Sequence, residues 1–214
     1  MSSDAPVVYA TKPLCVYLDD AASNKPAPGG GSVSALVGAL GAALVSMVCN
    51  LTRGREKFSG VEEQIQALVV RSEATRTTLE GLLQDDTTAY NGVIAAYRLP
   101  KETETEVAAR KAAIQAGLIA ATTVPLEICR ASLEVCGLSR TAAELGNPQA
   151  VTDAGIGAVL GEAAVVSAAL NVTINLGSIE DAAYIAATAA EIDALQAEAA
   201  ELRAEVLGIT HTKL

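Results

Sequence analysis

Aromatic residues and histidine are scarce in this chain of 214 residues, which has no Trp, one Phe and an aromatic content of 3%. Half of the residues are nevertheless hydrophobic, so the core must be built from Ala, Leu, Val and Ile, and wholesale disorder is excluded. The one histidine, His211, lies next to the C-terminus, which excludes His-based catalytic triads and His metal sites. The four Cys include no CxxC pair, as is typical of reduced, structural thiols. We therefore expect no metal site.

The chain also has few positively charged residues. The chain has 15 Lys and Arg against 25 Asp and Glu, and its net charge of −10 argues against a nucleic-acid-binding domain, which needs a basic face. The first dozen residues, MSSDAPVVYATK, lack the basic and then apolar segments of a signal peptide. We expect residues 1–12 to be an N-terminal extension, residues 13–214 to form a single domain, and the protein to be cytoplasmic.

One uncharged run raises the question of a membrane. Residues 31–51, GSVSALVGALGAALVSMVCNL, are long enough to cross a bilayer. They consist largely of Gly, Ala and Ser, however, and no Trp or Tyr flanks them as at a membrane interface. Small residues allow neighbouring helices to approach closely. We interpret the run as a tightly packed core helix and expect no membrane association.

Alanine, the best helix former, makes up roughly a fifth of the chain, so we predict an all-α fold, a bundle of long helices. Thr103 and Glu106 have the spacing of a capping box, and Pro125 is expected to kink the helix that they begin. The last helix has apolar or small residues at heptad spacing, which is typical of a coiled-coil-like C-terminal arm. Gly and Pro signals delimit predicted helices over 13–22, 32–52, 61–97, 103–145, 149–176 and 178–207.

The second and fifth of these helices, 32–52 and 149–176, are too apolar to have two solvent-facing sides. A second copy of the chain would cover the side that the core does not. We therefore predict a homodimer.

Asp86 is the most informative single residue. Helical spacing from Leu83, Tyr90 and Val93 puts its carboxylate inside an apolar stripe rather than on the solvent-facing side. Burial raises the pKa of a carboxyl group toward neutrality, as a general acid or base requires. The alternative is a structural Asp paired with an Arg or with the end of a neighbouring helix. Asp85, next to it, points further round the helix and is expected to be solvated.

A glycine-rich loop precedes the first apolar helix. Gly29, Gly30 and Gly31, with Ser32 after them, let the backbone approach a ligand closely, and the helix start offers unpaired N–H donors. No GK[ST] follows and no strand precedes, which excludes a P-loop and a dinucleotide fingerprint. The alternative is a plain tight loop before a helix.

Four polar residues surround or occupy the fifth helix. Asn147, before Pro148, has the pattern of an N-cap, and Asp153 that of a first-turn acid that complements the helix dipole. Asn171 and Asn175 lie four apart on one face of an apolar helix, so their amides need partners, across a subunit interface or on a ligand.

Arg53, Arg55 and Lys57 form the densest basic cluster of this acidic chain, and Arg98 and Lys101 add a second. One interpretation is ordinary surface charge at helix C-termini, where cations are favoured. The other is a local binding site for the anionic tail of a ligand.

These motifs together resemble the cyclodeaminase/cyclohydrolase family of folate enzymes, which includes the C-terminal domain of formiminotransferase-cyclodeaminase and stand-alone bacterial methenyltetrahydrofolate cyclohydrolases. The likeness covers about residues 13–207, and its glycine-rich motif and Asp-x-x-Ala-Tyr segment are quite specific. The segments that carry it are APGGGSVSALVGALGAALVSMV with RGREKF, LLQDDTTAY (82–90), RLPK (98–101), VPLEICR (124–130), GNPQAVTD (146–153) and ALNVTINL (169–176).

The resemblance implies an all-helical dimer with a folate site near the subunit interface. It places the catalytic carboxylate on Asp86 and matches Gly29, Gly30, Gly31, Ser32, Asn147 and Asp153 to site residues of the family. We expect Asp153 to be the second catalytic group, and the glycines, Ser32, Asn147 and Asn175 to bind substrate. The anionic glutamate tail of folate needs cations, for which Arg53, Arg55 and Lys57 are the candidates. It implies no cofactor beyond the folate substrate.

The leading functional prediction is hydrolysis of 5,10-methenyltetrahydrofolate to 10-formyltetrahydrofolate, because no formiminotransferase domain precedes this one. The first alternative is a formiminotetrahydrofolate cyclodeaminase, which forms the methenyl compound and releases ammonia. The second is a non-catalytic helical dimer that scaffolds a partner through its C-terminal heptads; the buried position of Asp86 argues against it, since an apolar residue would stabilise a purely structural bundle better.

Overall fold

The structure, a computed structural model, describes residues 7–214, and every regular element in this part of the chain is helical. The predicted all-α class is therefore confirmed. The α-helices are α1 (Leu14–Ala21), α2 (Gly30–Asn50), α3 (Glu62–Tyr97), α4 (Glu104–Leu145), α5 (Val151–Leu176) and α6 (Ala182–Lys213), and short 3₁₀ helices cover Tyr9–Thr11, Glu56–Val61 and Pro148–Ala150.

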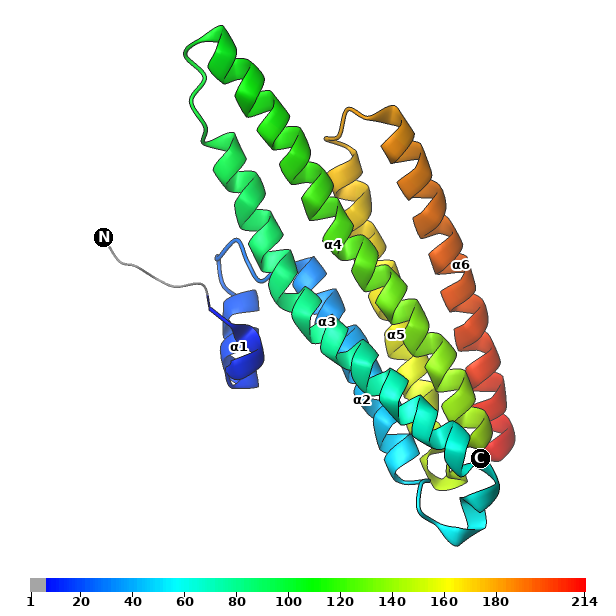
Figure 1. The fold of residues 1–214 in the computed structure, drawn as a ribbon. Helices are drawn as coiled ribbons and strands as arrows, with labels where there is room; N and C mark the ends of the chain where they lie inside the picture. Colours follow the sequence, from blue (N-terminus) through cyan, green and yellow to red (C-terminus); the bar gives the residue numbers. More distant parts are fainter. Residues whose placement is uncertain (1–6) are drawn as a thin grey trace.

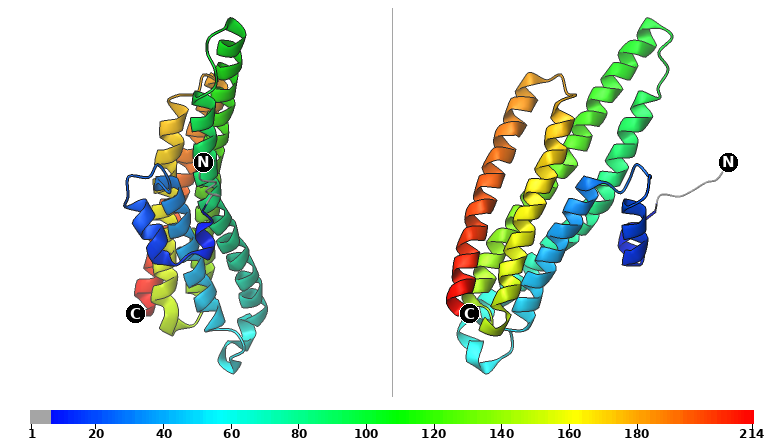
Figure 2. Two further views of the ribbon diagram at one scale, coloured as in Figure 1. Left: turned by 90° about the vertical axis from the view of Figure 1, so that its left-hand side faces the viewer. Right: turned by 180° about the vertical axis from the view of Figure 1, so that it is seen from behind.

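The five helices α2 to α6 form an elongated bundle, and α1 lies beside it against the start of α2 (Figures 1 and 2). Helix α4 packs against α3, α5, α6 and α2, and α2 also contacts α3 and α5. The α3–α4 hairpin projects beyond the other helices at one end of the bundle (Figure 1). At the other end lie the turn after α2, the start of α5 and the C-terminus (Figure 1).

Small residues set how closely α2 approaches α5. A Cβ atom added to Gly41 would lie 3.0 Å from the carbonyl oxygen of Gly157, so a larger residue at position 41 would push the two helices apart. Ala, Gly and Ser occupy most of the buried face of α2, so the helices pack closely without large aromatic side chains between them. The run 31–51 is thus a packed helix of the bundle, as predicted, with one face buried.

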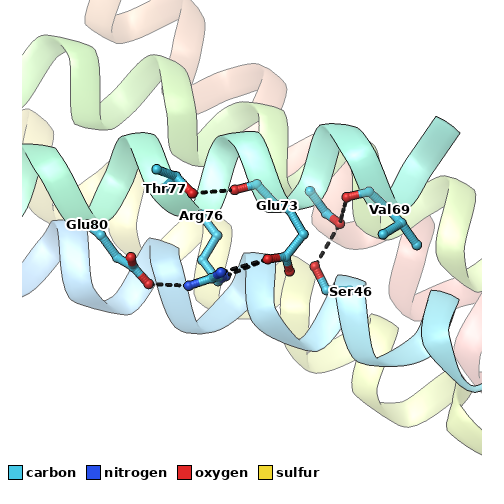
Figure 3. Close-up of polar contacts among 7 residues, drawn as sticks. Ser46, Val69, Glu73, Arg76, Thr77 and Glu80 are labelled. Atoms are coloured by element: carbon cyan, nitrogen blue, oxygen red, sulfur yellow. Dashed lines mark hydrogen bonds and ion pairs between the residues drawn. The ribbon is translucent and has the colours of Figure 1, made fainter. Parts of the chain in front are cut away.

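Polar contacts join the middle of α2 to α3. The hydroxyl groups of Ser46 and Ser72 are 2.8 Å apart in the buried interface, and Ser72 also donates to the carbonyl of Val69 (Figure 3). One turn further on, the guanidinium of Arg76 lies between the carboxylates of Glu73 and Glu80 on the same helix (Figure 3). Arg76 is therefore already paired and is a poor candidate for binding an anionic ligand.

The helix ends follow the predicted signals with two differences. The capping box of Thr103 and Glu106 is present, and α4 continues through Pro125. The last helix, α6, begins at Ala182 rather than at 178, and Asp181 caps it by accepting from the N–H groups of Ala183 and Tyr184. Helix α6 runs six residues past the predicted end at 207, because Lys213 donates to two carbonyls at the end of α4, those of Ala143 and Glu144.

The predicted C-terminal arm is wrong. The heptad residues Ile192, Ala199 and Val206 are buried within the bundle, where α6 packs on α4 and α5. Arg203 also forms an ion pair with Glu162 of α5, with Nε and Oε2 2.7 Å apart. The apolar side of α6 is used inside the chain, which removes the surface on which the scaffold alternative depended.

The predicted N-terminal extension, residues 1–12, is described only from residue 7 onward, and residues 1–6 lie outside the described part. Tyr9 is buried, its ring meets that of Tyr17 edge to face at 5.2 Å, and its backbone N–H donates to Gln84 of α3. The segment from Tyr9 to Thr11 therefore packs on the domain rather than extending away from it.

An apolar stripe remains exposed along α2 and α5. We call it the outer stripe; its largest exposures are 68% at Leu170 and 74% at Ile174. Three helical segments, Gly30–Asn50, Glu104–Leu145 and Pro148–Leu176, are long and apolar enough to cross a membrane by length and composition. The residues of the outer stripe are Val33, Leu40 and Met47 on α2 and Ile156, Val159, Val166, Leu170 and Ile174 on α5.

Candidate active site

A pocket of about 260 Å³ opens where α2 begins, between α3, α4 and α5. We call it the Asp86 pocket. Four sequence-predicted site residues beside Asp86 line it, namely the three glycines of the loop and Asn175. The complete lining is Pro26, Ala27, Gly29, Gly30, Gly31, Asp86, Ala89, Tyr90, Val93, Leu118, Ala121, Asn171 and Asn175.

The carboxyl group of Asp86 meets the N-terminus of α2. Its Oδ2 accepts a hydrogen bond of 2.9 Å from the backbone N–H of Ser32, in the first turn of the helix. Gly29, the N-cap residue, has no side chain to supply this bond, so Asp86 caps α2 from a neighbouring helix. A Cβ atom at Gly31 would overlap Oδ1 of Asp86, and only glycine permits this approach. Asp86 is thus both a structural residue paired with the end of a neighbouring helix, which was the predicted alternative, and a residue that lines the pocket.

Burial raises the pKa of Asp86, and the hydrogen bond from Ser32 opposes part of that increase. The group is therefore easier to protonate than an exposed aspartate, as predicted from the helical spacing. A carboxyl group of this kind, facing a pocket, has the property that general acid–base chemistry needs.

Ser32 lies behind the pocket wall. Its hydroxyl donates to the carbonyl of Leu83 on α3 and is 3.0 Å from the hydroxyl of Tyr17 on α1. Since the Ser32 proton is used on Leu83, the Tyr17 hydroxyl is the donor of the second bond. Burial raises the pKa of Tyr17, and the nearby charge of Asp86 adds to the increase. Ser32 thus links α1, α2 and α3 around the carboxyl group.

The remaining predicted residues lie at the opposite end of α2. Asn147 donates through its backbone N–H to Thr52, just after α2 ends, and Arg53, Arg55 and Lys57 follow in the next turn, which we call the basic turn. Because α2 has 21 residues and each adds about 1.5 Å, the two ends are roughly 30 Å apart. Asp153, in the first turn of α5, belongs to this far end, since α5 runs antiparallel to α2.

Asn147 is occupied within the chain. Its Oδ1 accepts from the N–H of Gln149, which confirms the predicted N-cap, with Pro148 at the first helical position. Its Nδ2 donates to the carbonyl of Leu51 at 3.4 Å. One chain therefore brings together Asp86, the glycines and Asn175, but not Asn147, Asp153 or the basic turn.

Sequence reasoning did not assign Tyr90 or Val93 to the site, although it placed both on the same stripe as Asp86. It left Asn171 open between a ligand contact and a subunit interface. Tyr90 is 41% exposed and lines the pocket, so the stripe contains the pocket wall as well as the core. Asn171 lies close to Gly30, with its amide 3.4 Å from where a Cβ would be. The sequence did contain a signal for Asn171: it lies four residues before Asn175, so the two side chains share the face of α5 that lines the pocket.

Among the described residues, no group of three or more His, Cys, Asp or Glu side chains is arranged to hold a metal ion. The polar side chains that line the Asp86 pocket are those of Asp86, Tyr90, Asn171 and Asn175.

Comparison with known proteins adds an independent observation. Residues 13–194 match the family model described as formiminotransferase-cyclodeaminase. The methenyltetrahydrofolate cyclohydrolase of Methylorubrum extorquens is 43% identical over 198 residues, which are 92% of this chain and 95% of that protein. The formimidoyltransferase-cyclodeaminase of Rattus norvegicus is 34% identical over 195 residues, 91% of this chain; the match spans 36% of the length of the rat protein.

A solved structure is similar over the same extent. The crystal structure of formiminotetrahydrofolate cyclodeaminase from Thermotoga maritima superimposes with a TM-score of 0.86 and 28% sequence identity. The match covers 95% of this chain and 98% of that one. The sequence resemblance and the helical fold therefore lead to the same group of proteins.

Proposed function

The chain belongs to the formiminotransferase-cyclodeaminase family, and we propose that it is a methenyltetrahydrofolate cyclohydrolase, which hydrolyses 5,10-methenyltetrahydrofolate to 10-formyltetrahydrofolate. The relative of that name is 43% identical and is covered over 95% of its length. The observation in the structure that carries the proposal is the partly buried carboxyl group of Asp86, which faces a pocket and has a raised pKa.

The chemistry needs a proton acceptor and then a proton donor. The methenyl carbon, between N5 and N10, is part of a cationic amidinium, and attack by water on it forms a C–O bond while the water gives a proton to a base. Collapse of the adduct breaks the C–N5 bond, N5 takes up a proton, and the hydroxyl proton leaves as the formyl group forms. The sum is one water consumed and one proton released. Asp86 is suited to both transfers, and its charge stabilises the cationic substrate.

The second candidate is a formiminotetrahydrofolate cyclodeaminase. The Thermotoga maritima structure of that name, which matches along almost its whole length, favours it. Both reactions involve the same carbon and the same two nitrogens, so one pocket serves either. The test is to add the protein to methenyltetrahydrofolate and follow loss of the methenyl chromophore, and separately to assay ammonia release from formiminotetrahydrofolate. Loss of the chromophore without ammonia release supports the cyclohydrolase; the opposite pattern supports the cyclodeaminase, and no change in either assay refutes both.

We further propose that the protein is a homodimer formed through the outer stripe. Eight large apolar side chains of α2 and α5 remain exposed in one chain, and a second copy would cover them. A twofold axis perpendicular to α2 would bring the far end of one subunit to the Asp86 pocket of the other. Asp153 and the basic turn would then complete the site from the partner subunit, with the basic turn on the glutamate tail of the substrate. Asn147 would hold that end in place through its bonds to Thr52 and Leu51.

Mixing two variants tests this arrangement. Asp86→Asn and Asp153→Asn homodimers should each be inactive, whereas a heterodimer has one site with both carboxyl groups. Random reassociation should restore about a quarter of wild-type activity, because half of the dimers are mixed and each has one intact site. If Asp153→Asn is fully active, Asp153 is not catalytic; if both variants are inactive and mixing restores nothing, the two groups do not meet across subunits.

The remaining proposals concern cofactors, nucleic acid and membranes. The donor set of the pocket supports a reaction that needs no metal or cofactor beyond the folate substrate. The net charge of −10 supports the absence of a nucleic-acid partner. We propose a cytoplasmic enzyme that does not insert in a membrane. The close packing of α2 on α5 inside the bundle supports the second point, and flotation with lipid vesicles tests it.

A further inference from the structure

Pro125 lies in the interior of α4 and is buried. A residue with an N–H at this position would donate it to the carbonyl four residues earlier, that of Ala121. Proline has no N–H, so the carbonyl of Ala121 is left without its helical partner. A buried or half-buried carbonyl needs another donor.

Asn175 of α5 supplies that donor. Its Nδ2 lies 2.9 Å from the carbonyl oxygen of Ala121 and bonds across from one helix to the other. Both residues line the Asp86 pocket. One N–H of Nδ2 is used on Ala121, and the side-chain acceptor that Asn175 has left for a ligand is Oδ1, which accepts no hydrogen bond from the part of the chain described here.

Asn171, one turn earlier in the same wall, shows what happens without a freed carbonyl. Its Nδ2 donates at 3.0 Å to the carbonyl of Ser167, four residues back in its own helix. That bond leaves the amide folded along α5. Asn175 instead bonds to α4, and the carbonyl that it reaches is the one that Pro125 leaves without a helical partner.

We propose that Pro125 is a positioning residue for substrate binding: it frees the carbonyl of Ala121, which holds the amide of Asn175 so that Oδ1 is presented to an N–H donor of the bound ligand. The inference rests on the proposed function, since the ring system of a reduced folate carries N–H groups that such an acceptor recognises. Pro125 itself lines no part of the pocket and acts only through Asn175.

The test compares Pro125→Ala with Asn175→Ala and the double variant. Pro125→Ala restores an N–H that competes for Ala121, so KM for methenyltetrahydrofolate should rise about fivefold to tenfold while kcat changes little. Asn175→Ala should have the same effect. The double variant should be no worse than Asn175→Ala alone, because both changes remove one contact. Val124→Ala, next in the chain, leaves the Ala121 carbonyl untouched and is the matched control.

Two readouts separate positioning from a purely structural role. The melting temperature of Pro125→Ala should not fall, because the helix gains a backbone hydrogen bond, and a crystal structure should show residue 125 bonded to Ala121 with the Asn175 amide displaced. Unchanged KM in a folded Pro125→Ala variant overturns the inference, as do additive effects in the double variant. Should Pro125→Ala not fold, an unchanged KM in Asn175→Ala overturns it equally.

The crystal structure of Pro125→Ala needs no substrate. It therefore distinguishes failure of the positioning role from failure of the proposed function. Displacement of Asn175 in a protein that acts on neither folate compound refutes the function together with the ligand assignment. An undisplaced Asn175 in an active enzyme refutes the positioning role alone.

Discussion

The two ends of the α2–α5 pair present asparagine in opposite ways. At the far end, Asn147 uses its backbone N–H, Oδ1 and Nδ2 on Thr52, Gln149 and Leu51, and it is buried. At the pocket end, Asn175 lines the cavity, uses Nδ2 on Ala121 and leaves Oδ1 without a partner among the described residues. Both were predicted to bind substrate. The difference shows that binding capacity depends on which hydrogen-bonding groups the fold leaves unused, and each prediction below tests one end against the other.

The largest effect is expected at the pocket end from Asp86→Asn. Turnover should fall by about 10²–10⁴-fold, because the proton-transfer group is lost while size is retained. Folding raises the pKa of Asp86, so its contribution to stability is most favourable below about pH 4 and declines as pH rises through the raised pKa. The variant should therefore melt at least as high as wild type at pH 7, with a smaller advantage at pH 4. Full activity in the folded variant would refute the catalytic assignment.

Gly31→Ala should have the next largest effect. The added methyl group overlaps Oδ1 of Asp86, so the carboxyl group must move, and a shift of about 1 Å in a catalytic group can cost on the order of 10²-fold in rate. Gly81→Ala on α3 is the matched control, since a Cβ there has no neighbour within 4 Å and Gly81 does not line the pocket. Steady-state kinetics of the two variants should differ strongly; similar activities would show that the close approach does not matter.

Leu170→Glu tests whether the two ends meet across subunits. A charge in the outer stripe should weaken dimerisation by about 30-fold, and activity should fall with it at low protein concentration. Val70→Glu is the control, since Val70 is 69% exposed on α3 and lies outside the outer stripe. Sedimentation velocity measures the effect. A wild type that is monomeric at micromolar concentration contradicts the proposed dimer.

Asn147→Ala should change stability rather than binding. Loss of the N-cap and of the bond to Leu51 should cost about 1–2 kcal/mol in the free energy of unfolding. KM should change less than twofold, about the reverse of the pattern for Asn175→Ala. Urea unfolding together with kinetics checks both. A large KM change at full stability would mean that Asn147 contacts the substrate and that the two ends are alike.

The smallest effect is expected from Arg55→Ala with Lys57→Ala. Each exposed contact contributes about 0.5–1 kcal/mol, so KM for polyglutamylated substrate should rise a few-fold, more than for the monoglutamate, with kcat unchanged. Added salt should weaken tail binding in the wild type in the same way. If turnover falls while KM is constant, the basic turn belongs to the catalytic centre or to dimer assembly, and the tail assignment is wrong.

Local sequence determined most of the fold. The capping box at Thr103, the N-cap at Asn147 and the Pro and Gly breaks depend on neighbours within a few residues, so the helix boundaries were predictable. The buried face of Asp86 was predictable for the same reason, because the 3.6-residue period relates it to Leu83 and Tyr90. The one long-range error, the free arm predicted for the last helix, arose because heptad spacing shows an apolar face but not what covers it.

The tertiary structure alone decided which predicted residues share a site. Motifs that were predicted to contact one ligand lie, within one chain, at the two ends of a helix about 30 Å long, a separation that no local pattern records. The tertiary structure also decided that Asp86 caps α2 and that Asn175 bonds to the carbonyl freed by Pro125. Each of these two hydrogen bonds joins residues that are 54 positions apart in the sequence. The sequence determines which groups a residue can offer. The packing of distant helices determines which of these groups remain free, because most buried donors and acceptors are used on partners within the chain.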